Sequence, residues 1–188
     1  MLQTTRYTRL AMLFHWVVAA FITINVLLAL TVDAMPKSFE RPFIDLHKSL
    51  GITVLGLAVL RILWRLANPP PAYPAAYAPW ERKAADLAHY TLYGLMFLLP
   101  LTGWTHDSAW KGAPTHPLNL FWVIPWFRFG FIETLSPATK EQIHSVFFQI
   151  HASLAYVLYV VVALHIAGAL KHQFVDKEQE LQRMLPGA

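Results

Sequence analysis

The chain contains no cysteine. This absence excludes covalent c-type haem attachment, iron–sulfur clusters held by cysteine, disulfide bonds and thiol redox relays. Charge is also scarce, because only 14% of the 188 residues are Asp, Glu, Lys or Arg while 56% are hydrophobic. The mean hydropathy of +0.40 is typical of a membrane protein. Any redox chemistry of this chain must therefore use a cofactor that is not covalently bound.

Long apolar segments predict four transmembrane helices, over residues 11–32, 47–66, 87–105 and 147–170. We expect one integral-membrane domain over residues 1–188, with an all-α fold that is a four-transmembrane-helix bundle. The first segment is too long for a cleaved signal peptide and lacks a clear small-residue cleavage site. Contact with the lipid bilayer follows directly from this fold.

The distribution of Lys and Arg predicts which side each connection faces. With the N-terminus inside, the inner segments hold nine of these residues and the outer segments six, which favours cytoplasmic positions for both termini. The basic pI of about 9.4 is explained by this rule, so no nucleic-acid binding is invoked. Between spans, Pro36 and Pro42 are expected helix breakers in an outer loop. We interpret residues 106–145 as an aromatic outer loop at the headgroup level, and Lys171–Met184 as a charged helical tail.

The most informative feature is a pair of histidines, His151 and His165, inside the last apolar segment. Fourteen helical residues return to within about 40° of the starting direction and rise about 21 Å. Both imidazoles are therefore expected on one helix face, one near each membrane surface. Ionisable side chains in hydrocarbon are costly and usually functional, and imidazole is a ligand of haem iron.

Depth pairs these histidines with two others. His15 lies early in an outward helix and His47 early in an inward one, so the expected pairs are His15 with His165 and His47 with His151. Each pair would give one iron two axial imidazoles, with two haems in the bundle core. A lone histidine in an apolar segment is more often hydrogen-bonded to a neighbouring helix, but four that pair by depth favour ligation.

Small residues one turn after each proposed ligand agree with a porphyrin lying against the helix. They are Ala19, Gly51, Ala155 and Ala169.

The remaining histidines and Arg61 have two interpretations each. His106, His116 and His144 are expected to be solvated loop residues. His89 and His172 lie at the cytoplasmic edge, where they are interfacial anchors or part of a quinone or proton site. Arg61 follows His47 by fourteen residues, so it either pairs with haem propionates or acts as a positive-inside anchor.

Several motifs resemble the bacterial cytochrome b561 family, over nearly the whole chain. They are Phe14-His15-Trp16, Leu46-His47-Lys48-Ser49-Leu50-Gly51-Ile52, Arg61-Ile-Leu-Trp-Arg65 before Pro69-Pro-Pro71, His89, and the His151/His165 pair followed by Leu170-Lys-His172. The resemblance implies a multi-pass inner-membrane protein with two non-covalent b haems that exchanges electrons with quinone. It places the ligand roles on His15, His47, His151 and His165. The cytochrome b subunits of formate dehydrogenase and nickel hydrogenase share this histidine layout.

Two axial imidazoles leave no open iron position, which favours electron transfer over oxygen binding. We expect electrons to pass between a donor and membrane ubiquinone. Because some family members are superoxide oxidases, the resemblance makes superoxide at the outer face a candidate donor, and the chain would then be a superoxide:ubiquinone oxidoreductase. The alternative is a haem-bearing membrane anchor subunit that passes electrons between a partner dehydrogenase and quinone. A small metal or proton transporter is a non-redox alternative, but the spans lack the acidic residues that transporters combine with histidine.

Overall fold

The computed structural model describes residues 6–185, so the outermost residues of both predicted cytoplasmic termini lie outside the described part of the chain. Four long helices dominate it: α1 (Arg9–Thr31), α2 (Lys37–Ala67), α3 (Pro79–Ser108) and α5 (Pro137–Leu170). A fifth α-helix, α4 (Gly130–Glu133), is a single turn. Short helical turns complete the helical elements, and they are η1 (Val32–Ala34), η2 (Ala113–Thr115), η3 (Lys171–Val175) and η4 (Leu181–Arg183).

The predicted all-α fold is largely confirmed, with one small exception. Two short strands, β1 (Asn119–Leu120) and β2 (Ile124–Pro125), form an antiparallel hairpin in which Leu120 pairs with Ile124. Among the described residues, three helices are long and apolar enough to cross a membrane: Arg9–Ala34, Lys37–Ala67 and Pro137–Val175. Helix α3 covers the expected span 87–105 but is not among the three, because polar residues such as His89, Thr91 and Thr102 lie within the span itself and lower its mean hydropathy.

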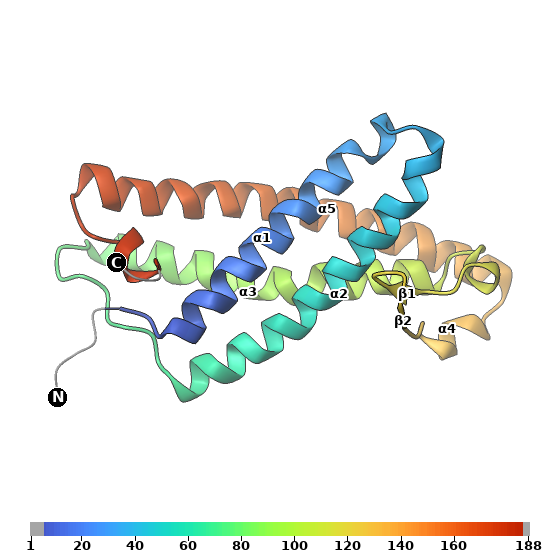
Figure 1. Cartoon of the computed structure of the whole chain (residues 1–188), viewed down its shortest axis with the longest axis horizontal. Helices are drawn as coiled ribbons and strands as arrows, with labels where there is room; N and C mark the ends of the chain where they lie inside the picture. Colours follow the sequence, from blue (N-terminus) through green and yellow to red (C-terminus); the bar gives the residue numbers. More distant parts are fainter. Residues whose placement is uncertain (1–5, 186–188) are drawn as a thin grey trace.

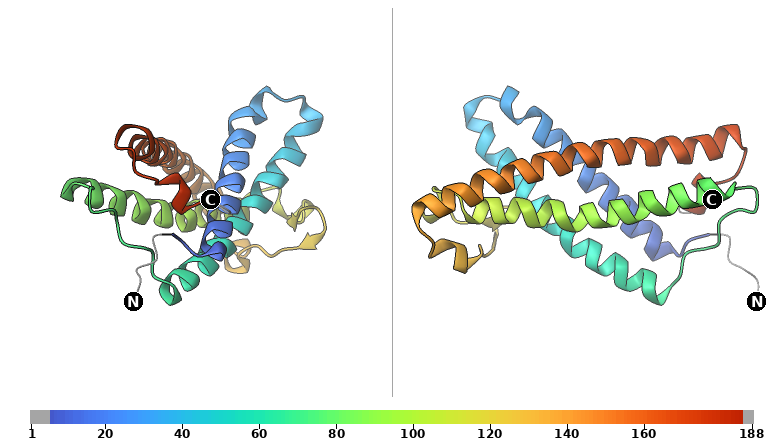
Figure 2. Two further views of the ribbon diagram at one scale, coloured as in Figure 1. Left: turned by 60° about the vertical axis from the view of Figure 1, so that its left-hand side comes forward. Right: turned by 180° about the vertical axis from the view of Figure 1, so that it is seen from behind.

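The long helices form two antiparallel pairs that cross one another (Figures 1 and 2). Helices α1 and α2 lie side by side in one pair, and α3 and α5 lie side by side in the other. The start of α1, the α2–α3 connection and the segment after α5 gather at one end, which we call the inner end. The β1–β2 hairpin, α4 and the start of α5 gather at the other, the outer end.

Local sequence signals explain where the helices begin. The hydroxyl of Thr8 accepts a hydrogen bond from the Ala11 N–H at the start of α1, and Ser136 does the same for Thr139 at the start of α5. Helix α3 begins at Pro79, whose missing N–H costs nothing at this position. Each cap satisfies backbone donors that a helix end would otherwise leave without a partner.

Helix α2 starts at Lys37, ten residues before the predicted span. We expected an outer loop over residues 31–46, between the first two spans, and this prediction was wrong from residue 37 onward. The added turns are polar and are stabilised by ion pairs one turn apart, Lys37 with Glu40 and Arg41 with Asp45. Pro42 lies inside this helix instead of breaking it. Its lost hydrogen bond falls in the exposed outer part of α2, where water can satisfy the freed carbonyl.

The core is small and lies where the two helix pairs cross. Val18 of α1, Val54 and Ala58 of α2, and Met96 of α3 form its buried centre. Most of the remaining apolar surface faces outward, because only 6% of the most apolar stretch of α1 and of α5 is buried, against 22% for α2. Such helices are suited to a lipid surrounding rather than to water.

The prediction of one outer loop over residues 106–145 was also wrong in its boundaries. Helix α3 continues to Ser108, and α5 already begins at Pro137. The segment between them is ordered by the hairpin, α4 and several hydrogen bonds to the helices. After α5, the predicted helical tail is only partly helical, with a π-helical turn in η3 and a single 3-10 turn in η4.

Candidate functional site

The outer pair of predicted histidines meets across the two crossing helix pairs. His47 of α2 and His151 of α5 have ring centroids 6.0 Å apart and ring planes at 74°. A transition metal lies about 2 Å from an imidazole nitrogen, so two rings on opposite sides of one metal have centroids about 6 Å apart. The spacing of these two rings therefore suits a shared metal centre.

Backbone carbonyls select the ring nitrogen that each outer imidazole leaves free. Nδ1 of His47 lies 3.2 Å from the Asn25 carbonyl oxygen, and Nδ1 of His151 lies 2.9 Å from that of Leu99. A carbonyl only accepts, so each Nδ1 carries the proton and each Nε2 keeps its lone pair. A hydrogen bond from one ring nitrogen to a backbone carbonyl is usual for a histidine that binds metal through the other nitrogen.

Helix α3 provides a close-fitting seat for the His151 ring. A Cβ added at Gly103 would lie 3.1 Å from Cε1 of His151. The hydroxyl of Thr102 lies 3.2 Å from the same ring's Nδ1. Any larger residue at position 103 would therefore crowd the imidazole, a contact that the sequence interpretation missed because Gly103 is far from His151 along the chain.

The inner pair meets in the same way but has more neighbours. His15 of α1 and His165 of α5 have ring centroids 6.2 Å apart, with ring planes at 59°. His89 of α3 also approaches, with its ring centroid 5.4 Å from that of His165. Three imidazoles from three helices therefore share the inner site, whereas the sequence placed His89 only at the membrane edge.

Arg61 lies within this inner cluster. Its Nη2 lies 3.3 Å from Nδ1 of His15, and its Nε donates to the Tyr93 hydroxyl at 3.1 Å. A guanidinium only donates, so Nδ1 of His15 accepts here, unlike Nδ1 in the outer pair. The structure thus places Arg61 at the inner histidines, where either of its two expected roles can operate.

Among the described residues, three buried side-chain atoms without a hydrogen-bond partner lie toward the outer end: Oδ1 of Asn25, Nε1 of Trp126 and Nη2 of Arg128. Asn25 is the residue whose backbone carbonyl binds His47. Buried polar groups normally have partners. These atoms, the ring spacing and the Nε2 lone pairs that the two outer imidazoles keep together fit a bulky cofactor with a central metal and polar edges.

A cluster of ion pairs lies at the outer end, next to His47 in the sequence of α2. The Asp107 carboxylate pairs with Lys48 at 2.5 Å and with Nε of Arg128 at 2.8 Å. The side chains of Asp107 and Arg128 are each only 6% exposed. Two cations around one carboxylate leave a net positive charge at this level, and burial strengthens its effect.

Two of the three histidines that we expected to be solvated loop residues are half-buried residues of long helices instead. His106 of α3 and His144 of α5 stack with ring centroids 3.8 Å apart, and each Nδ1 bonds to the other residue's backbone carbonyl. The prediction failed because both helices extend further outward than hydropathy indicated. His116 is exposed, as expected.

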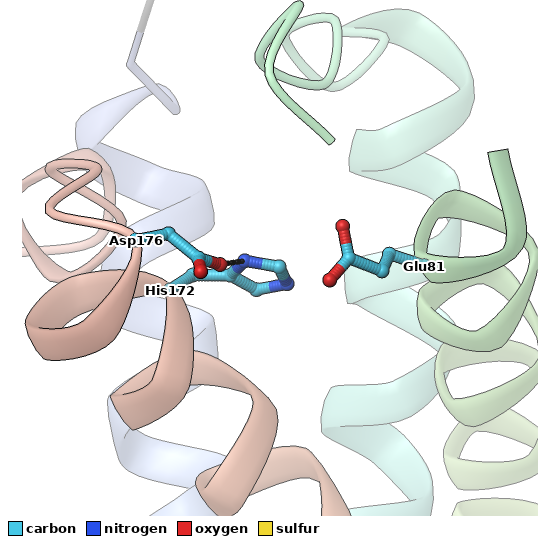
Figure 3. A group of neighbouring side chains, drawn as sticks. All are labelled: Glu81, His172 and Asp176. Carbon is cyan, nitrogen blue, oxygen red and sulfur yellow. Dashed lines mark hydrogen bonds and ion pairs between the residues drawn. The ribbon is translucent and has the colours of Figure 1, made fainter. Parts of the chain in front are cut away.

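His172 lies in a separate polar group at the inner end. Its ring stacks on Tyr77 with centroids 3.8 Å apart, and its Nδ1 lies 2.7 Å from the Asp176 carboxylate. Glu81 of α3 faces these two residues, as Figure 3 shows. The Lys171 ammonium pairs with both carboxylates. A cation of the chain itself thus already balances these acids, and the group joins α3 to the segment after α5.

Electrostatics in this polar group agree with an ion-pair network. The hydrogen bond from Lys171, helped by the one from His172, holds the pKa of Asp176 below its usual value. Burial, together with the hydrogen bond to Glu180, raises the pKa of Tyr77. Asp176 is thus ionised and Tyr77 neutral around pH 7, which preserves both contacts.

The fold and these histidines define a helical membrane protein with two places where facing imidazoles can hold a metal-centred cofactor. The family model for prokaryotic cytochrome b561 matches residues 6–187. The chain belongs to the prokaryotic cytochrome b561 family. It is a membrane haem protein of electron transport, and the family implies b-type haem.

Curated relatives agree along nearly the whole chain. Cytochrome b561 homolog 2 of Escherichia coli is 33% identical over 96% of this chain and 91% of its own length. Probable superoxide oxidase CybB of Yersinia pestis is 27% identical over 96% of each chain. Cytochrome b562 of Cereibacter sphaeroides is 26% identical over 98% of each chain.

Proposed function

We propose that this protein is a four-transmembrane-helix, di-haem b cytochrome that carries electrons across the bacterial inner membrane to or from ubiquinone. The observation that carries the proposal is the presence of two facing histidine pairs, with ring centroids 6.2 and 6.0 Å apart, at opposite ends of α5. The rise between His151 and His165 is about 21 Å along the helix, so the two sites lie near opposite membrane surfaces. Both termini are cytoplasmic in this topology.

In this proposal His15 and His165 hold one haem, and His47 and His151 hold the other. Each bound haem b supplies a centre that gains and loses one electron. The Asn25 and Leu99 carbonyls orient the outer imidazoles by accepting their Nδ1 protons. With two histidines holding each haem, no coordination site would be left open for oxygen. Arg61 and Arg128 are suited to bind the carboxylates at the haem edges.

Binding of haem to the inner pair requires a change at Arg61. As a ligand through Nε2, a neutral His15 carries its proton on Nδ1, which cannot then accept from the guanidinium. Arg61 would then turn from His15 toward an acceptor such as a haem propionate, while its contact with Tyr93 could remain. This movement favours the propionate role of Arg61 over that of a simple anchor.

For the outer electron donor we propose superoxide. The buried positive cluster of Lys48, Arg128 and Asp107 lies beside His47 and would attract an anion. A relative over nearly the full length has the printed name probable superoxide oxidase. The electron then leaves to ubiquinone at the inner end, where His89 and His172 lie.

The purified protein in ubiquinone-containing proteoliposomes tests this function. Enzymatically generated superoxide should reduce the haems and yield ubiquinol, and both signals should disappear after His151→Ala but not after His116→Ala. A protein that exchanges electrons with ubiquinol yet ignores superoxide would instead support the anchor subunit of a dehydrogenase. Failure with both partners would contradict the proposed electron path.

A further inference from the structure

The tip of the β1–β2 hairpin presents large apolar side chains that touch little of the protein. We define the hairpin tip as Phe121, Trp122, Val123 and Ile124, whose exposed fractions are 36%, 57%, 78% and 54%. The sequence from Pro117 to Phe127 contains no charged residue. Four consecutive exposed apolar residues in a loop facing water would be an unusual surface, so another apolar phase is expected to cover them.

The backbone of the hairpin tip is strained in order to carry these side chains. Phe121 and Trp122 have φ values of 50° and 63°. Two central residues with positive φ are the pattern of a tight hairpin turn that favours Asn-Gly. Each non-glycine residue in this conformation costs about 1–2 kcal/mol. Backbone strain of this kind is usually kept only where the strained residues have a function. Here the strained residues are the aromatic pair Phe121 and Trp122.

Three backbone N–H groups at or beside the hairpin tip have partners within the protein. The Phe121 N–H donates to the Ser49 hydroxyl at 2.8 Å, and the Val123 N–H donates to the Leu120 carbonyl at 3.1 Å. Pro125 has no N–H, and the Trp126 N–H donates to the Leu118 carbonyl at 2.9 Å. These internal bonds lower the cost of placing the side chains of the tip in lipid while its backbone stays at the headgroup level, because fewer backbone groups then need water.

The hydrogen bond to Ser49 also sets the depth of the hairpin tip. Ser49 is two residues inside the expected span 47–66, and it directly follows Lys48 of the outer ion cluster. The hairpin tip therefore lies at the level where the charged end of the bundle gives way to the apolar surface of α2. Trp104, whose indole donates to the Phe127 carbonyl, belongs to the same level. Aromatic residues gather at this boundary in membrane proteins.

We propose that the hairpin tip inserts into the lipid leaflet at the outer end of the protein, with phospholipid acyl chains as its occupant. The side chains of Trp122, Val123 and Ile124 enter the region just below the headgroups, and the contact fixes the height of the protein in the bilayer. The inference requires only that α2 and α5 cross the membrane. It does not depend on the haem ligands or on the electron donor.

A spin label on a single introduced cysteine tests this directly, because the chain has no cysteine of its own. The full chain, with haem, carries the label at Val123→Cys or, as a matched control in the same outer segment, at the exposed Lys111→Cys. Both are reconstituted into vesicles of phosphatidylethanolamine and phosphatidylglycerol. Collision with oxygen, which concentrates in lipid, is compared with collision with a water-soluble nickel chelate.

The label at residue 123 should collide more often with oxygen than with nickel, and the label at residue 111 should show the reverse. Greater nickel collision at residue 123 would overturn the proposal by placing the hairpin tip in water. Spin–spin broadening at residue 123 that disappears on dilution with unlabelled protein would also overturn it, because a second copy would then cover the tip.

A double variant separates lipid insertion from turn formation. Phe121→Asn with Trp122→Gly supplies the residues that suit the turn, so the hairpin should stay folded and the haem content should stay unchanged. The oxygen preference of the label at residue 123 should nevertheless fall several-fold, because the aromatic pair is gone. An unchanged preference would show that the strained aromatic pair does not hold the tip in lipid.

Discussion

His151 depends on residues of α3 as much as on its own helix. Its Nδ1 reaches the Leu99 carbonyl at 2.9 Å and the Thr102 hydroxyl at 3.2 Å, and its ring rests on Gly103. These contacts fix both the orientation of the ring and the nitrogen that stays free. In metal sites such supporting groups often matter nearly as much as the ligands.

We predict that Gly103→Ala weakens haem binding at the outer site about 10-fold. The added methyl group would lie 3.1 Å from Cε1 of His151, so the ring must move away from its seat. Haem retained during competition with apomyoglobin measures the effect, and low-temperature spectra show which haem is lost.

Gly94→Ala is the matched control on the same helix, because nothing lies within 4 Å of a Cβ added there. It should leave both haems bound, and alanine should stabilise α3 by about 0.5–1 kcal/mol. Equal haem loss in the two variants would mean that the effect comes from α3 in general and not from the seat of His151.

At the scale of helices, the crossing of α1/α2 over α3/α5 determines which residues can meet. The buried centre of Val18, Val54, Ala58 and Met96 holds the pairs together near the middle. Toward either end the pairs diverge, and there the histidines face one another. The crossing thus places one facing histidine pair toward each end of the bundle.

Gly51 should be sensitive to size because it lies against α1 near the outer site. A Cβ added there lies 3.6 Å from the Asn25 amide nitrogen. We predict that Gly51→Leu displaces α1 or blocks the haem, lowers outer haem content and destabilises the protein by about 1–3 kcal/mol. Haem quantification and thermal unfolding in detergent measure the two effects.

Gly56→Leu serves as the control for this substitution, since an added Cβ there meets nothing within 4 Å. It should keep both haems. Normal outer haem content in Gly51→Leu would show that the small residue after His47 is unrelated to cofactor space.

Hydropathy predicted the apolar, lipid-facing parts of the helices well. It predicted poorly the helix ends that lie in water or are stabilised by polar contacts. The apolar parts of α1, α2 and α5 match the predicted spans. The outer turns of α2 were missed because local ion pairs, such as Lys37 with Glu40, stabilise them instead of apolar packing. The start of α5 was missed although Ser136-Pro137 is a readable helix start.

The histidine pairs could be predicted because helical periodicity and depth are simple geometry. The pairs expected from spacing, His15 with His165 and His47 with His151, are the ones that the structure brings together, while their role as ligands stays a prediction. The approach of His89 to His165 and the stacking of His106 on His144 could not be predicted. Both depend on the rotation of α3 against α5, which no single-helix pattern encodes.

At the scale of the whole molecule, the inner and outer ends differ in chemistry. The outer end has the buried cluster of Lys48, Asp107 and Arg128, while the inner end has Arg61 beside His15 and the network around His172. This asymmetry suits different partners at the two surfaces, an anionic donor outside and a quinone that takes up protons inside.

We predict that His172→Ala slows ubiquinone reduction several-fold while both haems stay bound and reducible. Imidazole at the inner end can supply protons that the quinone needs. Stopped-flow oxidation of the pre-reduced protein by a soluble ubiquinone measures the rate, with His116→Ala as the control. Unchanged rates in His172→Ala and His89→Ala, with a slower rate in Trp126→Ala or Arg128→Ala, would move the quinone site to the outer end.

The central claim is that the four histidines form two separate haem sites, paired as the structure pairs their rings. Haem content in double variants, measured by the pyridine haemochrome method, tests it most directly because every variant lacks the same number of histidines. The unmodified protein should bind about two haems per chain. His15→Ala with His165→Ala, or His47→Ala with His151→Ala, should each retain about one haem, because one pair stays intact. His15→Ala with His151→Ala should retain none, because it breaks both pairs. A single haem in the unmodified protein, or equal haem content in all three double variants, would contradict the two-site account.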